Sequence, residues 1–132
     1  MFSFLKPLRK YEDFVQRAVF YDLLFLRKKA INIMKKAISL PFTHKEIASG
    51  HVYLGLLSLK TKDHLQALES FDTALEMVSE EKIYYNNNMK TIIETYMKYG
   101  DRKRGLYWLN HLLERQEYDK RFRKLEIYKD QF

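Results

Sequence analysis

The side chains in this chain that could most readily do chemistry are four histidines and two carboxylates on apolar stretches. Their spacing argues against catalysis. No histidine lies four residues from another or beside a fitting pair of carboxylates, as a zinc site on a helix requires. The carboxylates of Asp22 and Glu94 fit surface or groove charges better than catalytic groups. There is no glycine-rich phosphate loop and no nucleophile elbow. We therefore expect no enzyme activity, no metal site and no cofactor. The histidines are His44, His51, His64 and His111.

Composition favours a single helical domain. The chain has 132 residues, which suits one domain with a sizeable core. It contains only four glycines and two prolines, too few for the many turns of a sheet-rich fold. It has no cysteine, which excludes disulfides, a thiol nucleophile and a thiolate zinc site and fits a reducing cytosol. We expect a cytoplasmic protein.

The charge is moderately basic. The formal net charge is +7, from 24 Lys and Arg against 17 Asp and Glu, and this favours an acidic partner at long range. The basic residues are scattered in pairs and triplets, which is more typical of solvated faces than of a nucleic-acid surface. The longest apolar run, residues 18–26, contains Asp22 and is far shorter than the ~20 residues of a membrane span. No transmembrane segment is expected.

Capping signals divide the chain into helices. Thr43 with Glu46 and Asp63 with Gln66 have the spacing of capping boxes, Ser79 precedes two glutamates, and Gly100–Asp101 suggests a left-handed stop followed by a new start. Nothing in residues 26–29 demands a turn, so a single helix over 11–40 stays open as an alternative. The expected helices are 11–26, 27–40, 44–61, 64–78, 80–99, 102–116 and 118–130.

Small and apolar residues recur at fixed intervals in the chain. The set Leu54, Gly55, Ala67, Phe71 and Ala74 resembles the tetratricopeptide (TPR) repeat, in which small residues let two antiparallel helices pack closely, and we expect Gly55 to face Ala67. The family's tryptophan, tyrosine and turn-glycine positions carry other residues here. This copy begins at about residue 48, a further copy begins at about residue 11, and a more divergent one begins at about residue 86. The periods are therefore 37 and 38 residues. An ordinary helical bundle is the alternative. The residues at the three divergent positions are His51, Ser58 and Lys62, and the other copies rest on Phe14, Ala18, Tyr21, Ala30, Met34, Ala37, Tyr96, Gly100 and Gly105.

The resemblance implies an all-α fold. Antiparallel hairpins over 11–40, 44–78 and 80–116 would stack as a short right-handed solenoid within one domain, 1–132. A C-terminal helix, 118–130, would cap the stack with one apolar face, and a basic helix that binds a partner is the alternative. Because three repeats are few for an isolated solenoid, a homodimer through the terminal helices is also expected. The apolar residues of the capping helix are Tyr118, Phe122, Leu125 and Tyr128.

In TPR proteins the first helix of each hairpin lines a concave surface, which implies a non-catalytic adaptor or scaffold that binds a protein or peptide. The alternative function is nucleic-acid binding by a helical protein that uses its basic faces. The protein's own termini could also cover the groove. The apolar N-terminal residues Phe2, Phe4, Leu5 and Leu8 are expected to fill this chain's own groove or that of a second copy, with contact to an anionic membrane as the alternative. The implied groove residues are Val15, Val19, Asp22, Val52, Tyr53, Leu56, Leu59, Lys60, Asn87, Lys90, Thr91, Glu94 and Met97.

Overall fold

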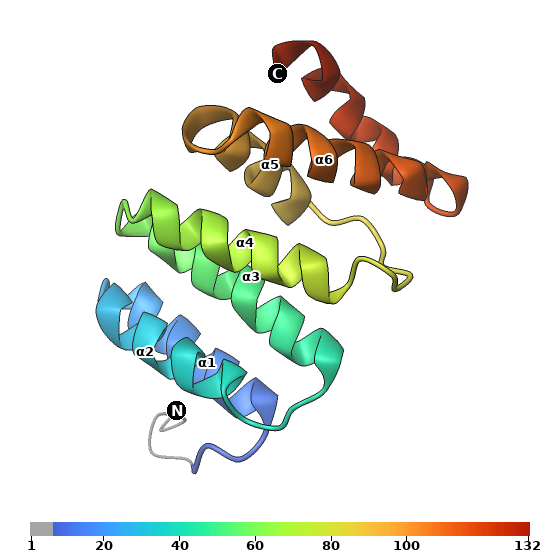
Figure 1. Ribbon diagram of the computed structural model, residues 1–132. Coiled ribbons are helices and arrows are strands. Elements are labelled where there is room, and N and C mark those ends of the chain that lie inside the picture. The colour runs from blue at the N-terminus through green and yellow to red at the C-terminus, as the bar shows by residue number, and fades with distance from the viewer. Residues whose placement is uncertain (1–6) are drawn as a thin grey trace. The chain divides into compact units, whose positions relative to one another are not determined.

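Helices make up all the regular secondary structure of the described residues, which are 7–132 of the computed structural model (Figure 1). No strand occurs among them, so the expected all-α class is confirmed. Contacts divide the chain into two compact units, Met1–Met77 and Val78–Phe132, which we call unit 1 and unit 2. The expected single domain and right-handed stack stay predictions.

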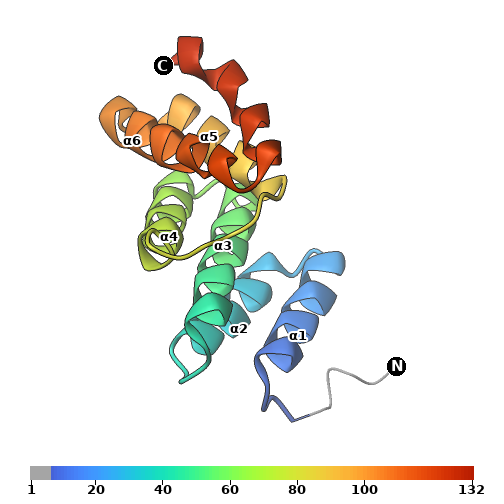
Figure 2. The ribbon, with the colours of Figure 1, turned by 90° about the vertical axis from the view of Figure 1, so that its right-hand side faces the viewer.

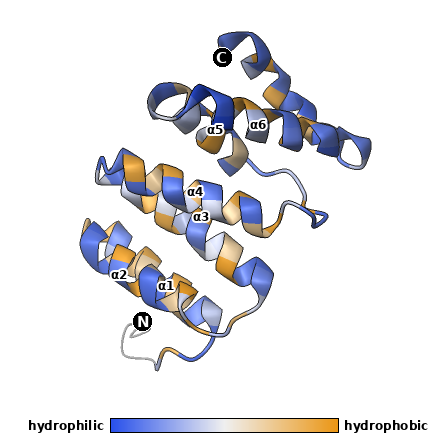
Figure 3. Cartoon of the chain, viewed as in Figure 1, coloured by the Kyte–Doolittle hydropathy of each residue, from blue (hydrophilic) through white to orange (hydrophobic). Residues whose placement is uncertain are grey.

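Unit 1 contains two helical hairpins. The first joins α1 (Tyr11–Leu23) to α2 (Arg27–Ile38), and the second joins α3 (His44–Lys60) to α4 (His64–Met77). Helix α2 packs against both α1 and α3, so the hairpins share a core. Each helix carries both hydrophobic and hydrophilic residues, as helices with one buried face and one solvent face do (Figure 3). The buried cluster consists of Phe14, Ala18, Ala30, Met34, Ala37 and Leu57.

The turns of the two hairpins have the same hydrogen bonds. The Leu26 N–H donates to the Tyr21 carbonyl at 2.9 Å, and the Asp63 N–H donates to the Ser58 carbonyl at 2.9 Å. Each residue of the second pair lies 37 positions after its counterpart. The structure therefore has two helices in 11–40, not one, and its second turn repeats the first.

The central residue of each turn adopts a left-handed backbone conformation. Phe25 has φ 61° and Lys62, which lies 37 residues later, has φ 62°. Glycine takes this conformation without the steric cost that a side chain adds. Lys62 thus has the left-handed backbone for which a glycine is expected in the TPR pattern.

Small residues occupy the helix crossings of unit 1. Gly55 on α3 is buried, but its nearest neighbour is the ring of Phe71 and not the expected Ala67. The large ring fills the space above the glycine, while Ala67 and Ala74 are buried on the same helix. The small positions were predicted correctly, and the ring of Phe71, one helical turn after Ala67, lies nearest to Gly55.

Both predicted capping boxes are seen: the first has both of its hydrogen bonds, and the second has one. The Thr43 hydroxyl accepts from the Glu46 N–H at 3.2 Å, and the Glu46 carboxylate accepts from the Thr43 N–H at 3.1 Å. The Asp63 carboxylate accepts from the Gln66 N–H at 3.2 Å. These contacts satisfy N–H groups that the first turn of a helix leaves unpaired.

Unit 2 contains α5 (Asn88–Tyr99) and α6 (Arg102–Leu113), followed by two 3₁₀ helices, η2 (Glu114–Glu117) and η3 (Lys120–Gln131). Gly105 on α6 is buried against Tyr96 of α5 and the ring of Phe132, in the small position predicted for it. The Asp101 carboxylate caps α6 by accepting from two backbone N–H groups. Gly100 has φ −104° and ψ 179°, so the expected left-handed stop is wrong and the chain leaves α5 in an extended conformation.

The helix predicted at 80–99 begins only at Asn88, and the predicted start at Ser79 is wrong. Residues 82–86 instead form an extended segment with no regular secondary structure. Side chains from the end of unit 2 bind the backbone of residues 78–85, which we call the strap. These side-chain hydrogen bonds take the place of the backbone hydrogen bonds of the helix that the acidic residues after Ser79 predicted.

The C-terminal helix is present but has a different geometry from the one expected. The helix predicted over 102–116 ends as an α-helix at Leu113. The helix predicted over 118–130 corresponds to the 3₁₀ helix η3. Phe122, Leu125 and Tyr128 are buried and lie three residues apart, the period of a 3₁₀ helix. This row packs on α6 and α5, and Figure 2 shows the red terminal segment beside both helices. Its role as a solenoid cap stays a prediction.

Of the four apolar N-terminal residues expected to fill a groove, the structure describes one, Leu8. Phe2, Phe4 and Leu5 lie outside the described residues. Leu8 is half-buried and packs against the core cluster of unit 1.

Candidate functional site

The predicted groove residues of unit 1 lie on α1 and α3, the first helices of the two hairpins. None of them is fully buried, and Val19 and Lys60 are exposed. Val15 and Tyr53 are half-buried and also pack against the core cluster. The α1–α3 face therefore offers part-exposed apolar side chains. The predicted residues on it are Val15, Val19, Asp22, Val52, Tyr53, Leu56, Leu59 and Lys60.

An ion pair joins the two helices on this face. The Lys60 Nζ atom lies 2.7 Å from Oδ2 of Asp22, a residue 38 positions earlier in the chain. The other oxygen, Oδ1, lies 3.3 Å from Nε of Arg27 at the start of α2. Asp22 thus links three helices, and the structure brings together two residues that the repeat pattern assigned to one groove.

Tyr53 lies near this ion pair. Its hydroxyl is buried and has no hydrogen-bond partner among the described residues. Burial, with the added repulsion of the Asp22 carboxylate, raises the pKa of Tyr53 to about 12. A buried hydroxyl without a hydrogen-bond partner costs free energy, so the Tyr53 side chain is held there by the packing of its ring and not by its polar group.

The remaining predicted groove residues belong to unit 2, on or next to α5. Asn87 is exposed at the N-terminus of α5, whereas Lys90, Thr91 and Met97 are part-buried on it. The Glu94 carboxylate accepts a hydrogen bond from the Tyr128 hydroxyl of η3 at 2.9 Å. Burial and the nearby Glu94 raise the pKa of Tyr128 to about 12. At Glu94, therefore, the chain's own C-terminal helix occupies part of the surface that was assigned to a partner.

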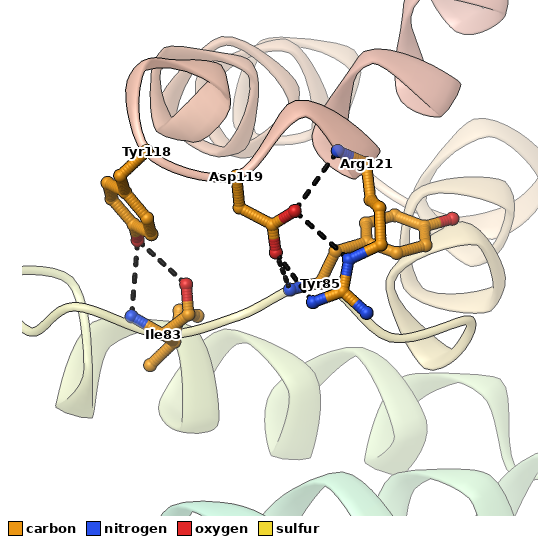
Figure 4. Close-up of polar contacts among 5 residues, drawn as sticks. All are labelled: Ile83, Tyr85, Tyr118, Asp119 and Arg121. Carbon is orange, nitrogen blue, oxygen red and sulfur yellow. Dashed lines mark hydrogen bonds and ion pairs between the residues drawn. The ribbon is translucent and has the colours of Figure 1, made fainter.

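The side chains that bind the strap were not predicted from the sequence. Tyr118 donates to the Ile83 carbonyl at 2.7 Å and accepts from the Ile83 N–H at 3.1 Å, while Asp119 accepts from the Tyr85 N–H at 2.9 Å (Figure 4). Two side-chain hydrogen bonds from Arg121, with the bond from Tyr85, hold the pKa of Asp119 well below its usual range. The available signal was the run of polar residues that follows the apolar end of α6.

Arg115 holds the beginning of the strap. Its guanidinium donates to the carbonyls of Val78, Ser79 and Glu81 at 3.1, 3.2 and 3.3 Å. The planar guanidinium presents several donors in fixed directions, which suits three carbonyls converging on it. This arrangement is structural, because its donors bind the protein's own backbone.

Neither a metal site nor a membrane span is visible in the part of the chain that the structure describes. Within residues 7–132 no three His, Cys, Asp or Glu side chains converge as metal ligands. Among the helices of the same residues, none has both the length and the apolar character needed to cross a bilayer. Burial lowers the pKa of His51, which favours its neutral form.

Comparisons with protein-family models, with curated proteins and with solved structures found no match to this chain.

Proposed function

We propose that this chain is a non-catalytic adaptor that binds a protein or peptide on the α1–α3 face of unit 1. The observation that carries the proposal is the contact of Asp22 with Lys60, which links the first helices of both hairpins. The TPR-like repeat and its binding role are part of this proposal. The repeated turns and the small residues at the helix crossings support it.

The chemistry of the face suits a ligand with both apolar and polar groups. Val19 and Leu56 provide apolar contact area on neighbouring helices, and burying such side chains is the main source of binding free energy. Lys60 is exposed, and its ammonium group, which has three N–H donors, can bind a carboxylate of the ligand while it stays paired with Asp22. An acidic, amphipathic peptide is the class that fits these features.

Selection from a peptide library displayed on phage would test the proposal. Peptides enriched on the full chain would be synthesised, and their affinity measured by fluorescence anisotropy against the wild-type protein and the variants Val19→Glu and Leu56→Glu. Each variant is expected to weaken binding at least about tenfold, because a carboxylate would replace an apolar contact. Circular dichroism would show that the variants stay helical.

The matched control is Leu65→Glu, because Leu65 is an apolar side chain on α4 that is 80% exposed. It makes the same chemical change outside the α1–α3 face and should leave the affinity unchanged. Failure to enrich any peptide, or equal affinity for the wild type and Leu56→Glu, would reject the proposal.

A further inference from the structure

The turn between α1 and α2 exposes four consecutive large apolar side chains. Residues 23–26 are Leu, Leu, Phe and Leu, and their exposed fractions range from 41% to 76%. Single exposed apolar residues are ordinary on a protein surface, whereas a contiguous cluster marks a site of interaction. The side chain of Phe25, the most exposed of the four, contributes little to the core.

The second hairpin shows that the turn does not need these residues. At the equivalent positions, 60–63, the chain has Lys, Thr, Lys and Asp and forms the same backbone hydrogen bonds. Phe25 also adopts the left-handed conformation, which is unfavourable for a bulky side chain. The apolar residues of the first turn therefore do not serve the turn itself, which points to a role outside the fold.

Basic residues lie beside the apolar turn. Arg27, Lys28 and Lys29 form the first turn of α2, which contains no acidic residue. Cations at a helix N-terminus are disfavoured by the helix dipole, so this placement also costs the fold some stability. Arg27 is paired with Asp22, whereas the Lys28 and Lys29 side chains are exposed.

The basic and apolar side chains form one surface. A recess is lined by Phe25, Leu26, the three cations and Thr61 of the second turn. The Arg27 guanidinium lies 4.9 Å from the centroid of the Phe25 ring. Both turns of unit 1 lie at the same end of the unit in Figure 1. An apolar tip with cations beside it is complementary to an anionic lipid surface, where apolar groups enter the acyl boundary and cations meet the headgroups.

We propose that the α1–α2 turn docks this protein on anionic phospholipid membranes. The side chains of residues 23–26 enter the boundary between headgroups and acyl chains, and Lys28 and Lys29 contact anionic headgroups. A lipid boundary is fluid and accepts side chains that leave a tight turn in several directions, whereas a protein pocket must match each of them. The proposal concerns a different surface from the α1–α3 face and does not depend on peptide binding.

Vesicle sedimentation with the full chain would test this docking. The vesicles are phosphatidylcholine with or without phosphatidylserine. The key variant exchanges the turn for its counterpart, with Leu23→Lys, Leu24→Thr, Phe25→Lys and Leu26→Asp made together. It adds two cations and one anion, so lost binding could not come from weaker attraction to the anionic lipid. We expect the wild type to bind the phosphatidylserine vesicles, and the exchange to weaken that binding at least about tenfold.

Two further variants separate the electrostatic contribution to vesicle binding from nonspecific binding by exposed apolar side chains. Lys28→Gln with Lys29→Gln should weaken binding to phosphatidylserine vesicles about tenfold or more, since each cation near an anionic surface contributes to attraction. Ile127→Thr, which removes a 62% exposed apolar side chain from η3, should leave binding unchanged. Circular dichroism would confirm that the variants remain folded.

A fluorescent reporter would place the turn in the bilayer. Tryptophan emission from Phe25→Trp should be quenched by lipids with brominated acyl chains, beyond any quenching of the native Trp108 in the wild type. The proposal is overturned if the wild type does not bind phosphatidylserine vesicles or if the exchange binds equally well. It is also overturned if the exchange only dissociates a dimer or removes a protein partner.

Discussion

Gly55 on α3 lies directly against the ring of Phe71 on α4. A Cβ atom on Gly55 would fall 2.4 Å from Cε1 of that ring, well inside van der Waals contact. Phe71 is fully buried, so the ring has little room to move away. This contact sets how closely the two helices of the second hairpin can approach.

Gly55→Ala is therefore expected to destabilise the protein, although alanine is the better helix former. Overpacking of a core typically costs about 1–3 kcal/mol, which outweighs the ~1 kcal/mol gained in helix propensity. Urea unfolding followed by circular dichroism would measure the change. Lys45→Ala, an exposed position on the same helix, is the control and should stay close to the wild type. A stabilised Gly55→Ala protein would show that the ring moves aside freely.

Lys62→Gly should stabilise the protein, because Lys62 has φ 62°. Left-handed backbone costs a non-glycine residue about 1–2 kcal/mol, and part of this gain is offset because glycine loses more entropy on folding. A gain of about 1 kcal/mol in the free energy of unfolding is expected from the urea midpoint. Lys62→Ala, which keeps a Cβ atom, should change stability little. If glycine and alanine behave alike, the left-handed turn is not the native one.

The helices of unit 1 could be predicted because local signals agree with the final fold. Thr43 and Glu46 cap the helix that they were expected to begin, and Gly55 lies at a close helix crossing. The break at Phe25 was harder to predict, since no glycine or proline marks it. That the ring of Phe71 lies nearest to Gly55 depends on the rotation of α4, which the spacing of small residues does not fix.

The strap shows where local reasoning fails. Ser79 followed by two glutamates is a sound helix start, but carbonyls of residues 78, 79 and 81 bind Arg115, which is 34 to 37 residues away. Such long-range hydrogen bonds leave no periodic pattern in the sequence. The Asp22 contact with Lys60 is also long-range. The repeat pattern placed both residues on one face but did not predict that they form an ion pair. The bond from Tyr128 to Glu94 could not be read from either helix alone.

Asp119 should make unit 2 sensitive to acid. Hydrogen bonds from Arg121 and from the Tyr85 N–H lower the pKa of Asp119 in the folded protein, whereas an unfolded aspartate has a pKa of about 3.9. Its stabilising contribution is thus present above about pH 4 and is lost as the pH falls toward the folded pKa. Asp119→Asn should lower the urea midpoint at neutral pH and flatten its decline between about pH 4 and pH 2.

Trp108 is the only tryptophan and is buried in unit 2, so its fluorescence can follow this unfolding. Asp130→Asn makes the same change in charge at an exposed position of η3 and should keep the wild-type pH dependence. An unchanged acid slope in Asp119→Asn would show that other carboxylates control acid unfolding.

Tyr118→Phe should release one specific amide of the strap. The Tyr118 hydroxyl accepts from the Ile83 N–H and donates to the Ile83 carbonyl, and phenylalanine keeps the ring but makes neither bond. We expect faster hydrogen exchange at the Ile83 amide, measured by NMR. The Tyr85 amide, which donates to Asp119, should keep its exchange rate and serves as the internal control. Equal acceleration at both amides would mean that the strap opens as a whole, and unchanged exchange at Ile83 would mean that Tyr118 does not protect it.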